Sequence, residues 1–466
     1  MTLQRDLVYQ TLDQLYRSSV ASQLARYALG LDYKTLPTDV IHQAKRCLLD
    51  ALGVAIGAYE APGRPMCESV VQELGGKEEA TVFCSGLRTT VLNATLMNCF
   101  MVRFLDFNDA GGGGHNSDSI PAILAVAERE KVSGADLLLS VVTSYELGAR
   151  VSQALRKAGL VLLGDARGGL TMPPTLGRLM KLNEGQIANA VGICASGSNP
   201  LKILDAHREE NSMRKNLRFG WVAYDAILSC LLAKKGFTGP IRIVEGDGGW
   251  RQSVLEGDID MWALADFSGW RILEVRHKSL PANGTTIAHI QNTIDIVKEQ
   301  DLKPEDIALV RVRTCEREAL HTTTFAKKYP RNAESADHSA QYGNAIAIKE
   351  RRYGADSMDP KKFTDPVVLD LIEKITVEAD PALGFHTYEV TTEITTKDGR
   401  KFEKHVMQPH GYGDDPLTDA ELEEKFRGMA AKYMDEKQMK QIFDTVWNIE
   451  KHDNVNQLMK LMVFKS

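Results

Sequence analysis

The strongest constraint in this sequence is a change in the spacing of its apolar residues near residue 270. Before about residue 260, apolar residues recur every three or four positions; segment 39–58, for example, has Ala44, Cys47, Leu48 and Ala51 on one face. This period is typical of amphipathic helices. Similar segments lie at 89–101, 119–130, 134–157, 184–196 and 212–234. We therefore predict a large helical domain here.

The pattern after residue 266 indicates a smaller α+β domain. Segments 270–280 and 307–316 are rich in β-branched and apolar residues, and a helical segment, 286–300, separates them. Two alternating runs within 388–406 flank the turn Lys397-Asp398-Gly399, which predicts a hairpin. The helical period returns after Pro416. We expect a mainly α fold: a discontinuous all-helical domain (1–266 and 411–466) with an inserted α+β domain (267–410).

Composition excludes several classes of function. The formal net charge of −6 argues against nucleic acid as a partner. The seven cysteines include no C-x-x-C pair, so we expect no zinc or iron–sulfur site and a reducing compartment. No apolar run approaches the roughly 18 residues of a membrane span, and the first residues do not resemble a signal peptide. These features predict a cytoplasmic protein that does not bind membranes.

The segment "LDFNDAGGGGHNSDSIP" (105–121) places four consecutive glycines between Asp106 and Asp109 on one side and His115 on the other. It has neither the Lys-Ser/Thr of a phosphate loop nor the G-x-G-x-x-G spacing of a dinucleotide site. Glycines let the main chain approach a ligand closely, so we predict that this loop, including Gly113, edges a site. The alternative is a surface turn whose polar residues satisfy local backbone groups.

The segment 212–234 is expected to be a helix with Arg214, Lys215 and Arg218 in its first turn. Cations at this end oppose the helix dipole and are better tolerated beside a bound anion. The alternative is a solvated charged face, because this helix also carries an apolar stripe that can be buried. That stripe comprises Met213, Leu217, Trp221, Tyr224 and Leu228.

Two further polar clusters lie in the predicted α+β domain. His277 and Lys278 end the predicted strand 270–280, and strand ends often carry functional residues. Asp337, His338 and Tyr342 begin an apolar helix. A buried tyrosine whose hydroxyl is simply satisfied would explain Tyr342 equally well.

Together these segments resemble one family. "LDFNDAGGGGHNSD", "SMRKNLRFGWVAYDA", "HKSLPA" and "DHSAQY" occur in the order found in the MmgE/PrpD superfamily of 2-methylcitrate dehydratases and cis-aconitate decarboxylases. The early "LLDALGVAIGA" helix extends the resemblance over nearly the whole chain. The resemblance implies the same two-domain fold, a homodimer, and catalysis without a metal or organic cofactor.

The resemblance also implies roles for individual residues. It assigns catalysis to His115, Lys215, Lys278 and Tyr342, with His115 as an acid/base candidate. Residues of the same segments are predicted to bind substrate: Asp106, Asp109, Gly113, Arg214, Arg218 and His277. Eliminating water from a hydroxy acid needs a base, an acid and fixed cations beside the carboxylate, and these residue types supply all three.

The chain departs from the family pattern at several positions. Ala110 replaces a threonine. The segment "GDARGGLTMPP", directly before the "TLGRLMKL" helix, has no histidine where decarboxylase-type members carry one. Asn283-Gly284-Thr285 stands where relatives carry a histidine. The segment "DAHREE" offers His207 and Arg208 as possible partners in place of a Tyr-Arg-His segment. These departures predict a changed pocket and leave open whether the substrate is the family's usual one.

These observations favour a cofactor-independent lyase that acts on a small polycarboxylate. Dehydration of a 2-methylcitrate-like hydroxy-tricarboxylate is the leading hypothesis, because "HNSD", "DHSAQY" and the missing upstream histidine resemble the dehydratase branch. Decarboxylation of a cis-aconitate-like acid and epimerisation of a related dicarboxylate are alternatives. A catalytically inactive dimer that keeps only the fold is the non-enzymatic alternative.

Overall fold

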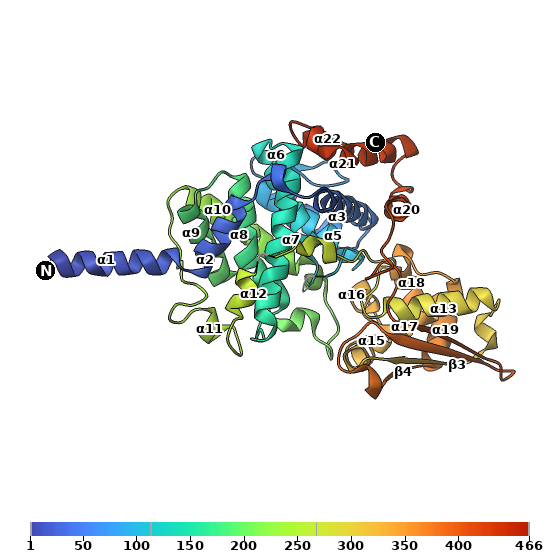
Figure 1. Cartoon of the computed structure of the whole chain (residues 1–466). Helices are drawn as coiled ribbons and strands as arrows, with labels where there is room; N and C mark the ends of the chain where they lie inside the picture. The colour runs from blue at the N-terminus through green and yellow to red at the C-terminus, as the bar shows by residue number, and fades with distance from the viewer. Residues whose placement is uncertain (1, 112–113, 267, 465–466) are drawn as a thin grey trace.

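The protein is mainly helical, with a smaller α+β region built on a four-stranded sheet (Figure 1). The computed structural model describes residues 2–111, 114–266 and 268–464. The first part of the chain forms these helices: α1 (Thr2–Arg17), α2 (Val20–Gly30), α3 (Thr38–Gly57), α4 (Gly63–Leu74), α5 (Val91–Phe104), α6 (Ile120–Glu130), α7 (Gly134–Arg156), α8 (Gly168–Leu179), α9 (Glu184–Gly197), α10 (Arg218–Lys234), α11 (Trp250–Ser253) and α12 (Met261–Ala265). Two short strands, β1 (Ala80–Thr81) and β2 (Arg88–Thr89), pair beside them. Within the described residues, no helix combines the length and apolar character that a bilayer crossing needs.

Helix α3 is the centre of the helical part. Every residue from Ala44 to Ile56 is buried, because α5, α7 and α20 (Asp419–Ala430) pack around this helix. The three- and four-residue spacing of apolar residues in 39–58 thus corresponds to a helix covered on several sides. The helical predictions for 89–101, 119–130, 134–157 and 184–196 are confirmed by α5, α6, α7 and α9.

The C-terminal helices return to the helical part of the molecule. Helix α20 packs along α3, α21 (Glu436–Trp447) also contacts α3, and α22 (Asn456–Leu461) packs on α21. In Figure 1 these red helices lie beside the dark blue α3, away from the sheet. The exact domain limits at 266/267 and 410/411 stay a prediction.

The sheet has the strand order β4-β3-β5-β6, from β3 (Ile307–Thr314), β4 (Ile375–Ala379), β5 (Val390–Thr396) and β6 (Lys401–Val406). Strand β3 runs parallel to β4, with Val310 opposite Ile375, and antiparallel to β5. Buried and half-buried residues alternate along β5, so one face of the strand packs inward. The predicted strand 307–316 and the hairpin are therefore confirmed; β4 was not predicted.

Helices cover the inward face of this sheet. Helix α13 (Ile287–Glu299) contacts β5 and β6, and α17 (Ala340–Glu350) contacts α13 and β4. Shorter helices complete the region: α14 (Glu316–Thr322), α15 (Phe325–Lys328), α16 (Ala333–Ala336), α18 (Pro360–Phe363) and α19 (Pro366–Glu373). The predicted helix 286–300 is confirmed by α13.

The predicted strand 270–280 is wrong. The segment begins with a 3-10 turn, Arg271–Glu274, and then runs extended with a single bridge from Arg276 to Ala110. Ile272 is fully buried, and its backbone N–H donates to the carboxylate of Glu146 in α7. The apolar residues of this segment therefore anchor the chain to the helical part instead of joining the sheet.

The prediction for 212–234 is wrong about where the helix begins and about which residues are buried. A 3-10 turn, Met213–Leu217, precedes α10. Lys215 and Arg218 are buried, so the alternative of a solvated charged face does not hold for these two cations. Helix α10 packs on α5, α8 and α9 through a face that includes small residues such as Ala223, and close packing favours this face. The larger residues that were predicted to be buried are not. Met213, Trp221 and Leu228 are exposed, and Leu217 and Tyr224 are half-buried.

Candidate active site

The loop after α5 brings Asp106 and His115 together. Asp106 has a left-handed φ of 47°, which aspartate tolerates better than most residues. Nδ1 of His115 lies 2.7 Å from the carbonyl oxygen of Asp109, which can only accept, so Nδ1–H is the donor. In the neutral ring the lone pair is then on Nε2, which lies 3.4 Å from Oδ1 of Asp106. The loop thus directs the basic nitrogen of His115 toward a carboxylate.

Asp109 lies inside the loop and not on a cavity wall. Its carboxylate accepts hydrogen bonds from the hydroxyl of Ser117 at 2.6 Å and from the hydroxyl of Tyr145 at 2.5 Å. Its side chain is buried, and burial raises its pKa. This arrangement ties both ends of the glycine segment to α7 and so positions His115.

Two of the four glycines have a structural reason to be glycine. Gly111 and Gly114 have φ values of 126° and 152°, where side chains are strained. A Cβ on Gly114 would lie 2.6 Å from a guanidinium nitrogen of Arg167, and one on Gly111 would lie 3.1 Å from the carbonyl oxygen of Glu274. Gly113, predicted to contact substrate, lies outside the described residues.

The extended segment after residue 274 separates His277 from Lys278. Neighbouring side chains of an extended chain point to opposite sides. The His277 ring faces α3, with Nε2 3.3 Å from the side-chain nitrogen of Gln43 and Nδ1 3.6 Å from Oδ2 of Asp50. Lys278 points the other way, toward Asp106. The structure therefore places Lys278 at the site and His277 behind it.

Lys278 and Asp106 form the centre of a buried ionic cluster. Nζ of Lys278 donates to the carbonyl oxygens of Asp106, at 2.5 Å, and Ala282, at 3.0 Å, and lies 3.2 Å from Oδ1 of Asp106. Arg103 donates to the same carboxylate at 2.5 Å. Burial of Asp106 favours its neutral form, but Lys278 and Arg103 outweigh burial and hold its pKa well below the usual range.

Burial also lowers the pKa values of the two candidates for proton transfer, Lys278 and His115. Burial lowers the pKa of Lys278 to about 8, although Asp106 opposes this shift. Burial, together with Arg103 and Lys278, lowers the pKa of His115 well below its usual value. At neutral pH, His115 is therefore an unprotonated base beside a lysine that loses its proton readily.

A second buried cluster adjoins the first. Nζ of Lys215 lies 2.5 Å from Oδ2 of Asp337 and 3.3 Å from Nδ1 of His338, and this Nδ1 lies 2.6 Å from Oδ1 of Asp337. One ligand atom each of Asp106, Asp337 and His338 lie within 4.8 Å of one another. The four motif segments noted in the sequence thus meet at one point, where the helical part and the α+β part face each other.

Besides Asp109 and His277, three further predicted site residues lie away from this point. Arg218 is buried but pairs with Asp205, at 2.8 Å, beside the second cluster. The guanidinium of Arg214 lies over the ring of Trp221, 5.9 Å from its centroid. Tyr342 is fully buried and donates its hydroxyl to the carbonyl oxygen of Ser357. This is the satisfied core tyrosine that the sequence left open as an alternative.

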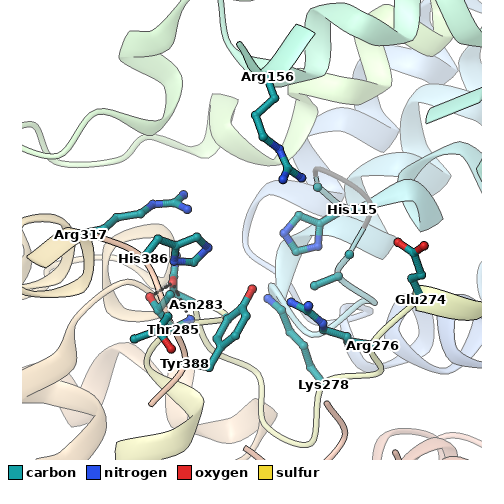
Figure 2. Close-up of a pocket in the computed structure, with 15 residues that line it drawn as sticks. His115, Arg156, Glu274, Arg276, Lys278, Asn283, Thr285, Arg317, His386 and Tyr388 are labelled. Atoms are coloured by element: carbon teal, nitrogen blue, oxygen red, sulfur yellow. Dashed lines mark hydrogen bonds between the residues drawn. The ribbon is translucent and has the colours of Figure 1, made fainter. Parts of the chain in front are cut away.

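A cavity of about 770 Å³ opens beside the first cluster, between the two parts of the molecule (Figure 2). His115 and Lys278 lie on its inner wall, while Arg156 extends toward it from α7 and Arg317 from α14. Its lining comprises Ala110, Gly111, Gly114, His115, Arg156, Glu274, Arg276, Lys278, Asn283, Gly284, Thr285, Arg317, His386, Thr387 and Tyr388. The cavity wall thus has four cationic side chains and one carboxylate, which suits a small polyanion.

The sequence motifs did not identify the three arginines that line this cavity, of which Arg156 and Arg317 form its rim. Arg156 ends α7, where a cation is ordinary because it complements the helix dipole, and Arg317 lies on α14. Arg276 lies over the rings of Tyr388 and Tyr412, at 4.9 and 5.5 Å. Only Arg276 carried a usable signal: it stands two residues before Lys278 in an extended segment and so shares its side.

Among the residues that the structure describes, two groups of side chains have ligand atoms spaced closely enough to hold a metal ion: Asp205, His321 and His338, and Asp106, Asp337 and His338. Each of the three carboxylates already has a cationic partner, since Arg218 pairs with Asp205, Lys215 with Asp337 and Lys278 with Asp106. A metal ion would compete with these cations. Metal-independent catalysis stays a prediction.

Comparison with known proteins identifies the family of this chain. Residues 22–261 match the MmgE/PrpD N-terminal domain and residues 280–449 match the MmgE/PrpD C-terminal domain. The chain is 22% identical to "Cis-aconitate decarboxylase-like protein oryM" of Aspergillus oryzae and 22% identical to a cis-aconitate decarboxylase of Aspergillus terreus, covering 97% of this chain and 98% of each relative. It is 23% identical to the cis-aconitate decarboxylase of Mus musculus, over 95% of this chain and 93% of that one. The chain therefore belongs to the MmgE/PrpD family.

Proposed function

We propose that this protein is a lyase that breaks a bond next to a carboxylate of a small polycarboxylate substrate. The observation that carries this proposal is the cavity whose wall combines Arg156, Arg276, Arg317 and Lys278 with His115. Fixed cations bind carboxylates and also stabilise the negative charge that develops when a neighbouring bond breaks. A neutral imidazole and an easily deprotonated ammonium supply the proton transfers.

The rim arginines are suited to binding and the inner pair to chemistry. Arg156 and Arg317 are exposed, so water competes with their contacts and they select for charge. Lys278 is fully buried, so its charge acts through a low dielectric on a carboxylate brought beside it. A bound carboxylate would also offset the cations that keep His115 unprotonated and so increase its basicity.

Decarboxylation of a cis-aconitate-like acid is the reaction that the relatives favour, because the relatives compared here carry the name cis-aconitate decarboxylase or a name derived from it. Loss of CO₂ leaves an electron pair that a neighbouring carboxylate can delocalise, with Lys278 and Arg276 beside it. Protonation of the carbon completes the reaction, and Lys278 is the candidate donor.

Dehydration of a 2-methylcitrate-like hydroxy-tricarboxylate is the second candidate. The dehydratase-like motifs "HNSD" and "DHSAQY" support it, and so does the position of a base, His115, and an acid, Lys278, on the same carboxylate of Asp106. Epimerisation needs the same base. A catalytically inactive scaffold explains the site least well. It does not account for buried ionic groups with shifted pKa values beside an open cavity.

A panel of acids tests the proposal. Purified protein is incubated with cis-aconitate, citrate, 2-methylcitrate and iminodisuccinate, with CO₂ release and product identity measured for each. CO₂ from cis-aconitate supports the carboxy-lyase, and a tricarboxylate alkene from 2-methylcitrate supports the hydro-lyase. If none of the four acids is turned over or raises the melting temperature, the inactive scaffold is the hypothesis that remains. Light scattering during size exclusion tests the expected homodimer.

A further inference from the structure

Three histidines form a line from the surface to the buried ionic clusters. His207 is exposed, His321 is 9% exposed and His338 is 2% exposed. Nδ1 of His207 and Nδ1 of His321 face each other in hydrogen-bonding contact. The rings of His321 and His338 lie 5.3 Å apart, and a nitrogen of each lies within 4.8 Å of the other, a gap that one water can bridge. None of the three lines the cavity.

The line continues from His338 to the cavity wall. Nδ1 of His338 contacts Asp337 at 2.6 Å, and Asp337 contacts Lys215 at 2.5 Å. His338 and Asp337 also approach Asp106 within 4.8 Å, and Asp106 contacts Lys278 at 3.2 Å. Consecutive polar groups between His207 and Lys278 thus lie in contact or within 4.8 Å of one another, a gap that one water can bridge.

The surroundings keep the central ring in a state that can both accept and donate. Burial, with His338 nearby, lowers the pKa of His321 to about 2, so this ring is neutral at physiological pH. A neutral imidazole takes a proton on one nitrogen and releases one from the other. Oδ1 of Asp205 is buried without a hydrogen-bond partner and lies 3.5 Å from Nε2 of His338, which it can orient. The other charged groups around the line are Arg218, Lys215, Lys327 and Arg317.

We infer that His207, His321 and His338 are a proton relay that resupplies Lys278 from solvent during decarboxylation. The inference rests on the proposed function. In that reaction the bond between the carboxylate carbon and its neighbour breaks, CO₂ leaves, and the electron pair stays on the substrate carbon. Lys278 gives that carbon its proton and becomes a neutral amine. One proton from water then restores the ammonium through the relay.

This proton balance separates the two candidate reactions. Decarboxylation converts one carboxylate and one proton into CO₂ and a C–H bond, so each turnover consumes a proton. Dehydration returns the abstracted proton to the departing hydroxide as water and needs none from solvent. A substrate that fills the cavity covers Lys278 on its open side, so a route behind the site is useful only to the decarboxylase.

The test compares His207→Ala with wild type in dilute buffer. His207 is exposed, so its removal should leave the melting temperature unchanged while kcat for CO₂ release falls about 10-fold, below the full effect of a positioned proton transfer. Added imidazole should restore kcat, and KM should not move. His321→Gln should show the same loss, with weaker rescue because the site is buried. His405→Ala, an exposed histidine on β6, is the matched control.

Each outcome decides the inference. Unchanged kcat in both variants, or a loss that imidazole does not restore, would overturn the relay while leaving decarboxylation standing. Absence of CO₂ from every acid with wild type would overturn decarboxylation itself, and the relay with it. Activity that disappears on chelation and returns with a divalent ion would overturn the relay, because His338 belongs to both groups that could hold the metal.

Discussion

The inner wall and the rim of the cavity are both cationic, yet their charges behave differently. Lys278 on the inner wall is fully buried, paired with Asp106 and shifted to a pKa of about 8. Arg156 and Arg317 on the rim are exposed. Burial turns a charge into a chemical group that can gain and lose a proton, whereas exposure leaves it a permanent charge that attracts anions. Depth alone thus separates a group that can transfer protons from groups that only attract anions.

Replacing the inner cation should have the largest effect. Lys278→Met should lower kcat about 1,000-fold, because it removes both the proton donor and a fixed charge beside the developing anion. It also leaves Asp106 short of a partner, so circular dichroism must confirm folding. Lys278→Arg keeps the charge but has no proton to give near neutral pH. Full kcat in a folded Lys278→Arg variant would contradict proton transfer by Lys278.

The pH profile should report the inner wall alone. Lys278 acts in its protonated form, and that form declines as pH rises through about 8. We therefore expect kcat/KM to fall about 10-fold per pH unit above this value, while the rim arginines stay charged throughout. The profile is measured with wild type and Lys278→Arg. An unchanged profile to pH values well above 8 would mean that another group supplies the proton.

Removing a rim cation should have a smaller effect, and on binding only. Arg317→Ala should raise KM about 5-fold with kcat unchanged, because an exposed charge contributes modestly to holding a carboxylate. The increase should shrink at high salt, which screens exposed charges. The control is Arg313→Ala. Arg313 lies on β3, is half-buried and pairs with Glu403. A drop in kcat for Arg317→Ala would place this arginine in the chemistry and erase the contrast with Lys278.

Chelation should have the smallest effect. The carboxylates of both candidate metal groups already have cationic partners, so we expect EDTA to leave kcat and KM unchanged. Steady-state assays before and after dialysis against EDTA check this. Loss of activity that a divalent ion restores would mean that the inner wall uses a metal, and its contrast with the rim would need a different explanation.

The sequence predicted the inner wall better than the rim for a physical reason. Lys215, Lys278, Asp106 and His115 stand in compact local motifs, so each could be found without knowing what it contacts. The rim arginines, Arg156 of α7 and Arg317 of α14, come from two segments whose approach depends on how the two parts of the chain pack. No local spacing encodes that approach.

The errors in predicting the fold from the sequence have similar causes. The apolar residues of 270–280 predicted a strand, but Glu146 on a distant helix holds Ile272. The stripe containing Trp221 was expected to be buried, yet α10 packs through its smaller residues. Strand β4, five residues long and mostly not buried, has too short a pattern to find. Regular helices such as α3 and the hairpin were predicted because their own sequence determines them.

The ion pairs across the two parts of the molecule also govern how the chain folds. Asp106 and Lys278 are separated by 172 residues, and Lys215 and Asp337 by 122. A chain with one part detached would lack a partner for each of these charges, and breaking a buried pair costs about 3–5 kcal/mol. Detaching one part is therefore costly, and we expect these pairs to couple the unfolding of the two parts. The site itself is complete only when segments that are distant in the chain have docked.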